Sequence, residues 1–388
     1  MQLEKTEIIF RGLPYWKGVQ SQPGIEERID LCLGWDDRGF IRQTTPENVL
    51  NEVLDAYSKK EYSFITAPPG LSTWANRLGE EKLAFIKKAC HGRRNKVYLE
   101  IGAGSLYIAK RIIQDAEAAK YIVVDPAISD ESEDARIHII KDYFSELIAI
   151  EEDVDIMIAL NCLEHVSDPV DFLMQARSLL LKSKGRLLLS VPDVERMFSV
   201  GDVNAVLHEH ISYFTENTLL SLLQRCGFNT LLCEKEADSL KVVAEPDDTT
   251  TIDVGVAGLQ ADECFTKATN AFSKGLCNLK HYLDPYALSG VPVAFHGANN
   301  GLNNALALAA ASENANFWVF DSDESKCGRY LPALRNPIRH SLDPFYKSMD
   351  AVFVSATAFF SEIRDFLVSS HGIKEPLIKP LYPIELYD

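Results

Sequence analysis

The feature that most constrains the fold is a short apolar segment followed at once by two glycines, within residues 97–109 (VYLEIGAGSLYIA). Its first four residues predict a buried strand that ends in the carboxylate of Glu100, and a helical pattern follows the glycines. Gly102, Ala103 and Gly104 form the turn, because glycine reaches dihedrals that a side chain blocks and lets a ligand approach closely. A strand, a glycine turn and a helix in this order predict a nucleotide-binding βαβ unit.

An acidic residue ends the second predicted strand, residues 121–124 (YIVV), where Asp125 and Pro126 follow. A carboxylate at this place can accept hydrogen bonds from both hydroxyls of a ribose. The order E-x-G-x-G and then an acid resembles class I S-adenosyl-L-methionine (SAM) methyltransferases more than dehydrogenases, since the third glycine of a dinucleotide fingerprint is missing. The alternative is a structural turn in an NAD-type or other α/β domain.

Composition limits the classes of partner. The net charge of −17, from 39 basic and 56 acidic residues, argues against nucleic acid, because binding a polyanion needs clustered Lys and Arg. The eight cysteines never form C-x-x-C, which is typical of a reducing cytosol. No signal peptide and no run of about 18 apolar residues is visible. We therefore expect a cytoplasmic protein without a membrane partner, and the oligomeric state stays open.

The alternation of elements divides the 388 residues into three predicted regions: 1–90, 91–246 and 254–388. The first is a substrate-side module that we expect to consist of loops and of helices near 46–59 and 79–90. The second alternates apolar strands and helices, as in a Rossmann-like α/β domain with a covered parallel sheet. The third repeats this pattern as a second, smaller Rossmann-like domain. Its glycine turn at 297–301 either cradles a phosphate or only starts a helix.

Polar residues follow the next two predicted strands of the middle region. Asp142 and Tyr143 follow the third strand, where an acid can accept from an adenine amino group and an aromatic ring can stack. Asn161 ends the fourth strand, and His165 follows it. Parallel strands bring their carboxyl ends to one edge, where ligands bind. This edge predicts a cofactor site made of Glu100, Gly102, Ala103, Gly104, Asp125, Pro126, Asp142, Tyr143 and Asn161.

Residues 208–215 (HEHISYFT) form the second stretch that carries chemistry. At strand spacing, His208 and His210 would share one face while Glu209 points away. Such a pair could bind metal, but no third and fourth ligand at useful spacing is evident, so we expect no metal. A histidine with a pKa near neutral beside a carboxylate suits a general base.

Together, the SAM core, the EHISYFT stretch and the strand–GANNG–helix unit resemble the sugar C-methyltransferase family, which methylates carbon 3 of nucleotide-linked 4-keto-deoxysugars. The resemblance implies that SAM is the methyl donor and that His210 is the catalytic base, with Glu209 as the preceding carboxylate. It also implies that Tyr62 is an active-site tyrosine. Tyr62 and His165 are the candidates for donating a hydrogen bond to the oxyanion that develops at the ketone oxygen. The Glu164-His165 pair resembles the "EH" of many class I methyltransferases, which implies a substrate-positioning or structural role for His165.

The chain departs from the family pattern at two places. The family's N-terminal C-x-x-C motifs hold a structural zinc, whereas here only Cys32 remains and Trp35 stands where the second cysteine would be. Leu207 stands where the family often has a tyrosine. We expect a small-molecule acceptor in small-molecule biosynthesis, with a nucleotide-linked sugar as the first candidate. The alternatives are an O- or N-methyltransferase, a non-catalytic SAM- or nucleotide-binding module, and a dehydrogenase.

Overall fold

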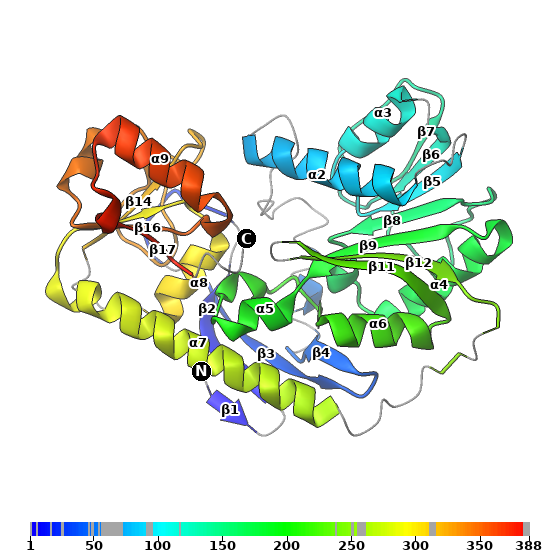
Figure 1. Ribbon diagram of the computed structural model, residues 1–388, viewed down its shortest axis with the longest axis horizontal. Coiled ribbons are helices and arrows are strands. Elements are labelled where there is room, and N and C mark those ends of the chain that lie inside the picture. The colour runs from blue at the N-terminus through cyan, green and yellow to red at the C-terminus, as the bar shows by residue number, and fades with distance from the viewer. Residues whose placement is uncertain are drawn as a thin grey trace.

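In the computed structural model, the chain folds into three β-sheets with helices around them (Figure 1). It describes residues 2–4, 7–15, 18–24, 27–45, 47, 50–52, 55, 73–90, 96–115, 118–236, 239–249, 252–253, 261–309 and 316–382.

The largest sheet has seven strands in the order β11-β12-β9-β8-β5-β6-β7. They are β5 (Lys96–Ile101), β6 (Ala118–Val124), β7 (Ile137–Ile140), β8 (Ile156–Leu160), β9 (Arg186–Pro192), β11 (Phe228–Glu236) and β12 (Ser239–Pro246). Strands β5 to β9 are parallel, and β12 runs antiparallel to both of its neighbours. Successive residues of the central strands enter two separate buried cores, one on each face. This confirms the predicted parallel sheet and explains its near-continuous apolar strands.

Helices cover both faces of this sheet. Helices α2 (Thr73–Ala89) and α3 (Tyr107–Gln114) pack on one face, and α4 (Pro169–Ser183) and α6 (Glu216–Arg225) pack on the other. Helix α4 begins where the Asp168 side chain accepts from two backbone N–H groups of the first turn. The predicted helix at 79–90 is confirmed as part of α2, whereas most of the one predicted at 46–59 lies outside the described residues.

An antiparallel sheet occupies the N-terminal region, where we predicted only loops and helices. Its strands, in sheet order, are β1 (Gln2–Glu4), β2 (Glu7–Pro14), β3 (Arg28–Asp36), β4 (Phe40–Gln43) and β10 (Ser212–Tyr213). The glycines, prolines and aromatics of 12–24 dominated the pattern and concealed the flanking strands. The last strand, β10, comes from the middle region of the chain, so the His-rich stretch is bound to the N-terminal sheet.

The C-terminal region confirms the expected second Rossmann-like domain. Its sheet is parallel throughout, in the order β15-β14-β13-β16-β17. The strands are β13 (Val293–His296), β14 (Phe317–Asp321), β15 (Arg339–His340), β16 (Ala351–Val354) and β17 (Ile378–Pro380), and the helices are α7 (Ala261–Ser289), α8 (Asn300–Ala309) and α9 (Phe360–His371). Within the described part of the chain, none of the helices is both long and apolar enough to cross a membrane.

One hydrophobic core joins the N-terminal sheet to the C-terminal domain. Helix α7 runs along the N-terminal sheet (Figure 1), and the ring of its Phe272 lies 5.3 Å from that of Phe10. Backbones touch where α7 meets the turn after α5 (Val194–Ser199): a Cβ on Gly275 would lie 2.1 Å from the backbone nitrogen of Gly201. Deleting the C-terminal domain would expose this core, so point substitutions are the suitable test of that domain.

Candidate active site

The order of the central sheet reverses at β5, because β6 and β7 lie on one side of it and β8 and β9 on the other. Open α/β sheets bind ligands outside the carboxyl ends of the strands at such a switch point. Here these ends carry the glycine turn after β5 and residues 161–165 after β8. The two segments lie close together, since a Cβ on Gly102 would be 3.1 Å from Sγ of Cys162.

Asp125 fastens the glycine turn from the end of β6. Its buried carboxylate accepts from the N–H of Gly104 through Oδ2 and from the N–H of Ala127 through Oδ1, both at 2.7 Å. Each oxygen keeps a second lone pair for a ribose hydroxyl. Gly102 and Gly104 have φ of 70° and 65°, which favours glycine, and a Cβ on Gly104 would meet nothing within 4 Å. An adenosine-bearing cofactor therefore fits this place, because there is space beside the turn and the Asp125 oxygens can accept hydrogen bonds from its ribose.

The other predicted cofactor residues lie at the same edge, where Asp142, Tyr143 and Asn161 are exposed. Asp142 Oδ1 accepts from the N–H of Tyr143, and the Tyr143 ring is available for stacking. Asn161 has a φ of 56°, which turns the chain sharply at the end of β8. Ala103 and Pro126 are half-buried beside them.

Glu100 differs from the others, because its carboxylate points into the protein. Its Oε2 accepts from the Tyr121 hydroxyl at 2.8 Å, and burial raises its pKa to about 7. Lys82 on α2 places a positive charge near Glu100 and near Glu164, and burial lowers the pKa of this lysine. No local pattern singles out Lys82, since a lysine on an amphipathic helix is usually solvated. Glu100 is thus a buried carboxyl group at the end of β5, directly before the glycine turn.

A cluster of two histidines and a carboxylate lies beside this edge. Helix η1 (Leu163–His165) follows β8 and carries Glu164 and His165, and the rings of His165 and His210 are 4.8 Å apart at 75°. His165 Nδ1 lies 3.0 Å from the carbonyl oxygen of Glu209, and its Nε2 lies 3.9 Å from Glu164 Oε1. The structure therefore brings together His210, His165 and Glu209, all predicted as site residues. Tyr62 lies outside the described residues.

His208 has a different role from His210, and the prediction that they share one face was wrong. Residues 208–210 form a turn rather than a strand, with the N–H of His210 bonded to the carbonyl of Leu207. His208 Nε2 lies 3.2 Å from the carbonyl of Ile29, and its ring packs against Tyr15. His208 thus fastens the turn to the N-terminal sheet, and only His210 enters the cluster.

Burial sets the protonation states of the cluster. It lowers the pKa of His210 well below the ordinary value of 6.5, and the nearby His165 adds to this effect, while a hydrogen bond to the Ala205 backbone opposes it. It also lowers the pKa of His165 to about 4. Burial raises the pKa of Glu164 to about 8. Near neutral pH, both imidazoles are therefore neutral, whereas Glu164 holds a proton. Burial makes His210 a weaker base than the near-neutral histidine that we expected from the sequence, but leaves it unprotonated and so able to accept a proton.

Two side chains from other sheets hold the segment that carries His210. The Gln43 amide on β4 donates to the carbonyls of His208 and His210, at 3.0 and 2.8 Å. From the C-terminal domain, Asn304 on α8 donates to the carbonyl of Val206 at 3.0 Å. All three regions of the chain thus position the histidine, through contacts more than 90 residues apart that no local pattern reveals.

Gln43→Met should lower the free energy of unfolding by about 1–3 kcal/mol, because it leaves two buried carbonyls without their donor. Urea denaturation measures this change. The control is Gln114→Met at the exposed end of α3, which should stay within about 0.5 kcal/mol of the parent protein. Equal effects of the two substitutions would show that Gln43 does not fasten the segment.

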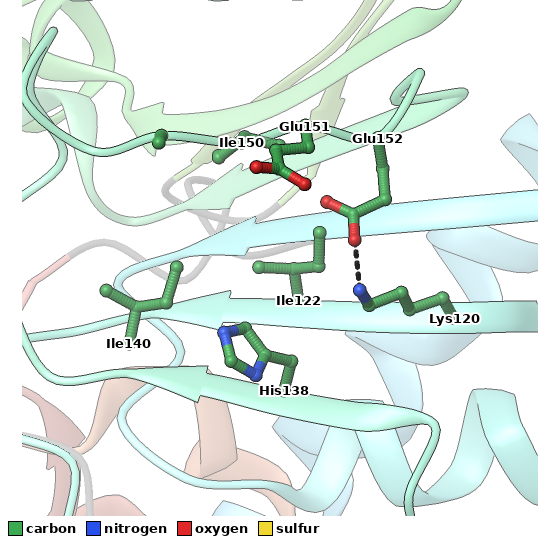
Figure 2. A pocket seen from close by; sticks show the side chains of 8 residues that line it. Lys120, Ile122, His138, Ile140, Ile150, Glu151 and Glu152 are labelled. Atoms are coloured by element: carbon green, nitrogen blue, oxygen red, sulfur yellow. Dashed lines mark hydrogen bonds and ion pairs between the residues drawn. The ribbon is translucent and has the colours of Figure 1, made fainter.

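A separate hollow of about 160 Å³ lies along β6 and β7 (Figure 2). It is lined by Lys120, Ile122, His138, Ile140, Ala149, Ile150, Glu151 and Glu152. Lys120 and Glu152 form an ion pair across it. None of the predicted site residues lines this hollow, so it is distinct from the edge where the cluster lies.

Comparison with known families identifies the middle region. Residues 74–232 match the sequence model of a family described as a methyltransferase domain. This range contains the glycine turn, Asp125 and His210. The protein is a SAM-dependent methyltransferase, and SAM is its cofactor. No curated protein matched the chain.

Solved structures of methyltransferases are also similar to parts of this chain. A SAM-dependent methyltransferase from Mesorhizobium loti is 14% identical, with 42% of this chain and 95% of the other covered and a TM-score of 0.35. N,N-8-amino-8-demethyl-D-riboflavin dimethyltransferase from Streptomyces davawensis is 16% identical, with 45% of this chain and 56% of the other covered and a TM-score of 0.37. Magnesium protoporphyrin IX methyltransferase from Synechocystis PCC 6803, solved with bound SAH, is 14% identical, covering 52% and 97%, with a TM-score of 0.36.

Proposed function

We propose that this SAM-dependent methyltransferase methylates a carbon next to a ketone in a small molecule, with His210 as the general base. The state of His210 carries the proposal. The imidazole is buried and neutral, and its hydrogen bond to the Ala205 carbonyl uses one ring nitrogen as a donor. The other ring nitrogen can therefore accept a proton. A neutral, oriented histidine is what removal of a carbon-bound proton requires.

The site residues orient the acceptor and move its proton. SAM supplies an activated methyl group on a sulfonium, so the chain must generate the nucleophile and hold it in line. His210 takes the proton next to the ketone, which leaves an enolate whose carbon faces the methyl group. Holding both reactants in this geometry supplies much of the rate. Glu209, buried beside His210, and the Tyr213 ring, 6.0 Å from the His210 ring, keep water out.

A hydrogen-bond donor is needed at the ketone oxygen, where negative charge develops. His165 is not suited to be this donor. A carbonyl oxygen only accepts hydrogen bonds, so His165 Nδ1 must donate to the carbonyl of Glu209. The neutral ring then has no proton on Nε2 to donate to the ketone oxygen. Glu164 holds a proton near neutral pH and is a better donor. We therefore assign oxyanion stabilisation to Glu164 together with Tyr62, and a positioning role to His165.

The C-terminal domain supports a nucleotide-linked acceptor, such as a nucleotide sugar. Its turn after β13 repeats the bond pattern of the SAM edge: Asp321 Oδ2 accepts from the N–H of Ala298 at 2.7 Å, as Asp125 accepts from Gly104. Lys326 lies against the same turn, 3.2 Å from Asp321, and adds a positive charge. We propose that regions 1–90 and 254–388 contact the acceptor while region 91–246 holds SAM.

O- or N-methylation of another small molecule is the second candidate, because the same base would serve it. A non-catalytic SAM-binding module is the third candidate, and the oriented, neutral imidazole of His210 argues against it. Mass spectrometry and NMR of the methylated product identify the accepting atom and so decide between the first two. Any turnover rules out the third. A cytoplasmic location and a role in small-molecule biosynthesis stay predictions.

Asp125→Ala should weaken SAM binding by about 1–3 kcal/mol, since it removes the proposed ribose acceptor and the carboxylate that fastens Gly104. Calorimetry with SAM measures the loss. Asp365→Ala, an exposed substitution on α9, is the control and should bind SAM like the parent protein. Unchanged affinity in Asp125→Ala would remove this residue from the proposed cofactor site.

A further inference from the structure

The cluster of Glu164, His165 and His210 has a property that general-base chemistry does not use. We propose that these three side chains bind one divalent transition-metal ion of the Zn²⁺ class, and that the bound ion switches off the base. The inhibitory part rests on the proposed function, whereas metal binding itself does not.

The donor set and its spacing suit such an ion. Imidazole nitrogen and carboxylate oxygen are zinc ligands, and the ligand atoms of the three residues all lie within 4.8 Å of one another. Glu164 binds the ion as a carboxylate, so its proton is released to solvent when the ion binds. Bonds of about 2.0–2.2 Å place the ligands of a tetrahedral ion about 3.4 Å apart. Glu164 and His165 are already 3.9 Å apart, so shifts of about 1 Å complete the shell. Among the residues that the structure describes, no other group has this composition and spacing.

The two imidazoles are oriented as in metal sites. Metal-ligating histidines usually donate their second ring N–H to a backbone carbonyl or carboxylate, which fixes the tautomer and the ring. His165 has this bond to the Glu209 carbonyl, and His210 has it to the Ala205 carbonyl. In each ring the other nitrogen is therefore unprotonated, as a metal ligand must be.

Glu164 supplies an independent sign of a missing ligand. Its side chain is 2% exposed, and Oε2 has no hydrogen-bond partner within the described part of the chain. A buried oxygen without a partner is costly, so such atoms in native proteins usually contact water, an ion or a ligand. An ion between Glu164 and the two histidines would satisfy this oxygen.

Nearby charges act on the ion in opposite directions. The carboxylate of Glu209 lies near Glu164 and attracts a cation, whereas Lys82 on α2 repels it. Three protein ligands leave a fourth position for water. An ion bound to the unprotonated ring nitrogen of His210 prevents this nitrogen from accepting a proton. The ion and the proton of the acceptor therefore compete for the same nitrogen atom.

The test is a zinc titration of the full chain, freed of metal and saturated with S-adenosylhomocysteine, against a chromophoric chelator. We expect one equivalent of Zn²⁺ per chain and a loss of affinity of at least about tenfold in both Glu164→Gln and His165→Asn. His138→Asn, at an exposed histidine on β7, is the matched control and should bind zinc like the parent protein. Binding of S-adenosylhomocysteine shows that each variant is folded.

A second readout uses Co²⁺ in place of zinc. Its visible absorption intensifies when four protein and water ligands replace six waters, and this band should disappear in Glu164→Gln. Absence of stoichiometric binding, or equal affinity in all three variants, overturns the site. Both measurements are made without the acceptor, so they test metal binding independently of which residue is the base. Zinc that binds at one equivalent yet leaves exchange of the acceptor's alpha proton unchanged overturns the inhibitory role.

Discussion

His210→Asn should lower turnover by about 10²–10⁴-fold and leave SAM affinity nearly unchanged. The substitution removes the neutral imidazole that the Ala205 carbonyl orients, and asparagine cannot accept the acceptor's proton. It leaves the glycine turn and Asp125 in place, since neither contacts this side chain through a hydrogen bond in the described structure. Calorimetry with SAM and a turnover assay on the identified acceptor measure the two quantities.

Deuterium exchange isolates the proton-removal step from methyl transfer. With S-adenosylhomocysteine and a keto acceptor bound, the alpha proton should exchange with solvent deuterium, although no methyl group is available. His210→Asn should lose exchange and methylation together. The matched control is His208→Asn, two residues away, which should keep exchange but lose stability, because His208 bonds to the Ile29 carbonyl in the N-terminal sheet.

Two outcomes would change the assignment. Near-normal turnover in His210→Asn would remove this residue from the role of base. A product methylated on oxygen or nitrogen would keep His210 as the base and replace carbon methylation with the second candidate function.

Local signals were sufficient to predict the parallel strands of the two α/β sheets. Strands β5, β6 and β8 are apolar on both faces, and each ends in a polar residue or a glycine turn, so their limits were visible in the sequence. The same locality explains why Gly102, Gly104 and Asp125 were predicted together. Their contacts join consecutive βα units, whose geometry varies little among such folds.

The cluster could not be predicted, because it depends on contacts between distant segments. His208 and His210 are alike in sequence, and only the pairing of β10 with β4 decides which of them enters the site. His210 lies 45 residues after His165 (210 − 165) and 46 after Glu164 (210 − 164) in the chain, which is why the sequence showed no third metal ligand. The N-terminal sheet was missed for the same reason: its pairings, not its glycine-rich composition, make it a sheet.

The free energy of unfolding should be greatest near pH 6.5, with net losses on the order of 1 kcal/mol at pH 5 and at pH 8. The acid side comes from histidines that burial keeps neutral: burial lowers the pKa values of His165, His208 and His296 to about 4. Below pH 6.5 these histidines bind protons in the unfolded chain but stay neutral in the native state. The stability from these groups is complete above pH 6.5 and is lost as the pH falls toward 4.

The alkaline side has the opposite sign. Burial raises the pKa values of Glu164 to about 8 and Glu100 to about 7, against 4.5 ordinarily. Their contribution is complete below pH 4.5 and falls as the pH rises, because the unfolded chain releases protons that the native state holds. Between pH 4.5 and 6.5 the more numerous histidines outweigh this loss. Above pH 6.5 the remaining gain from the histidines fades, and the loss from the two glutamates outweighs it, so the contribution of these groups to stability declines up to about pH 8.

Urea denaturation at pH 5, 6.5 and 8 tests this balance with one variant for each side. Glu164→Gln keeps the shape of the side chain without a proton to lose, so it should flatten the decline between pH 6.5 and 8. His208→Asn should reduce the loss between pH 6.5 and 5 and leave the alkaline side as it is. Stability that rises steadily from pH 6.5 to 8 would mean that Glu164 and Glu100 are ionised in the folded protein, and it would remove Glu164 as the proposed oxyanion donor.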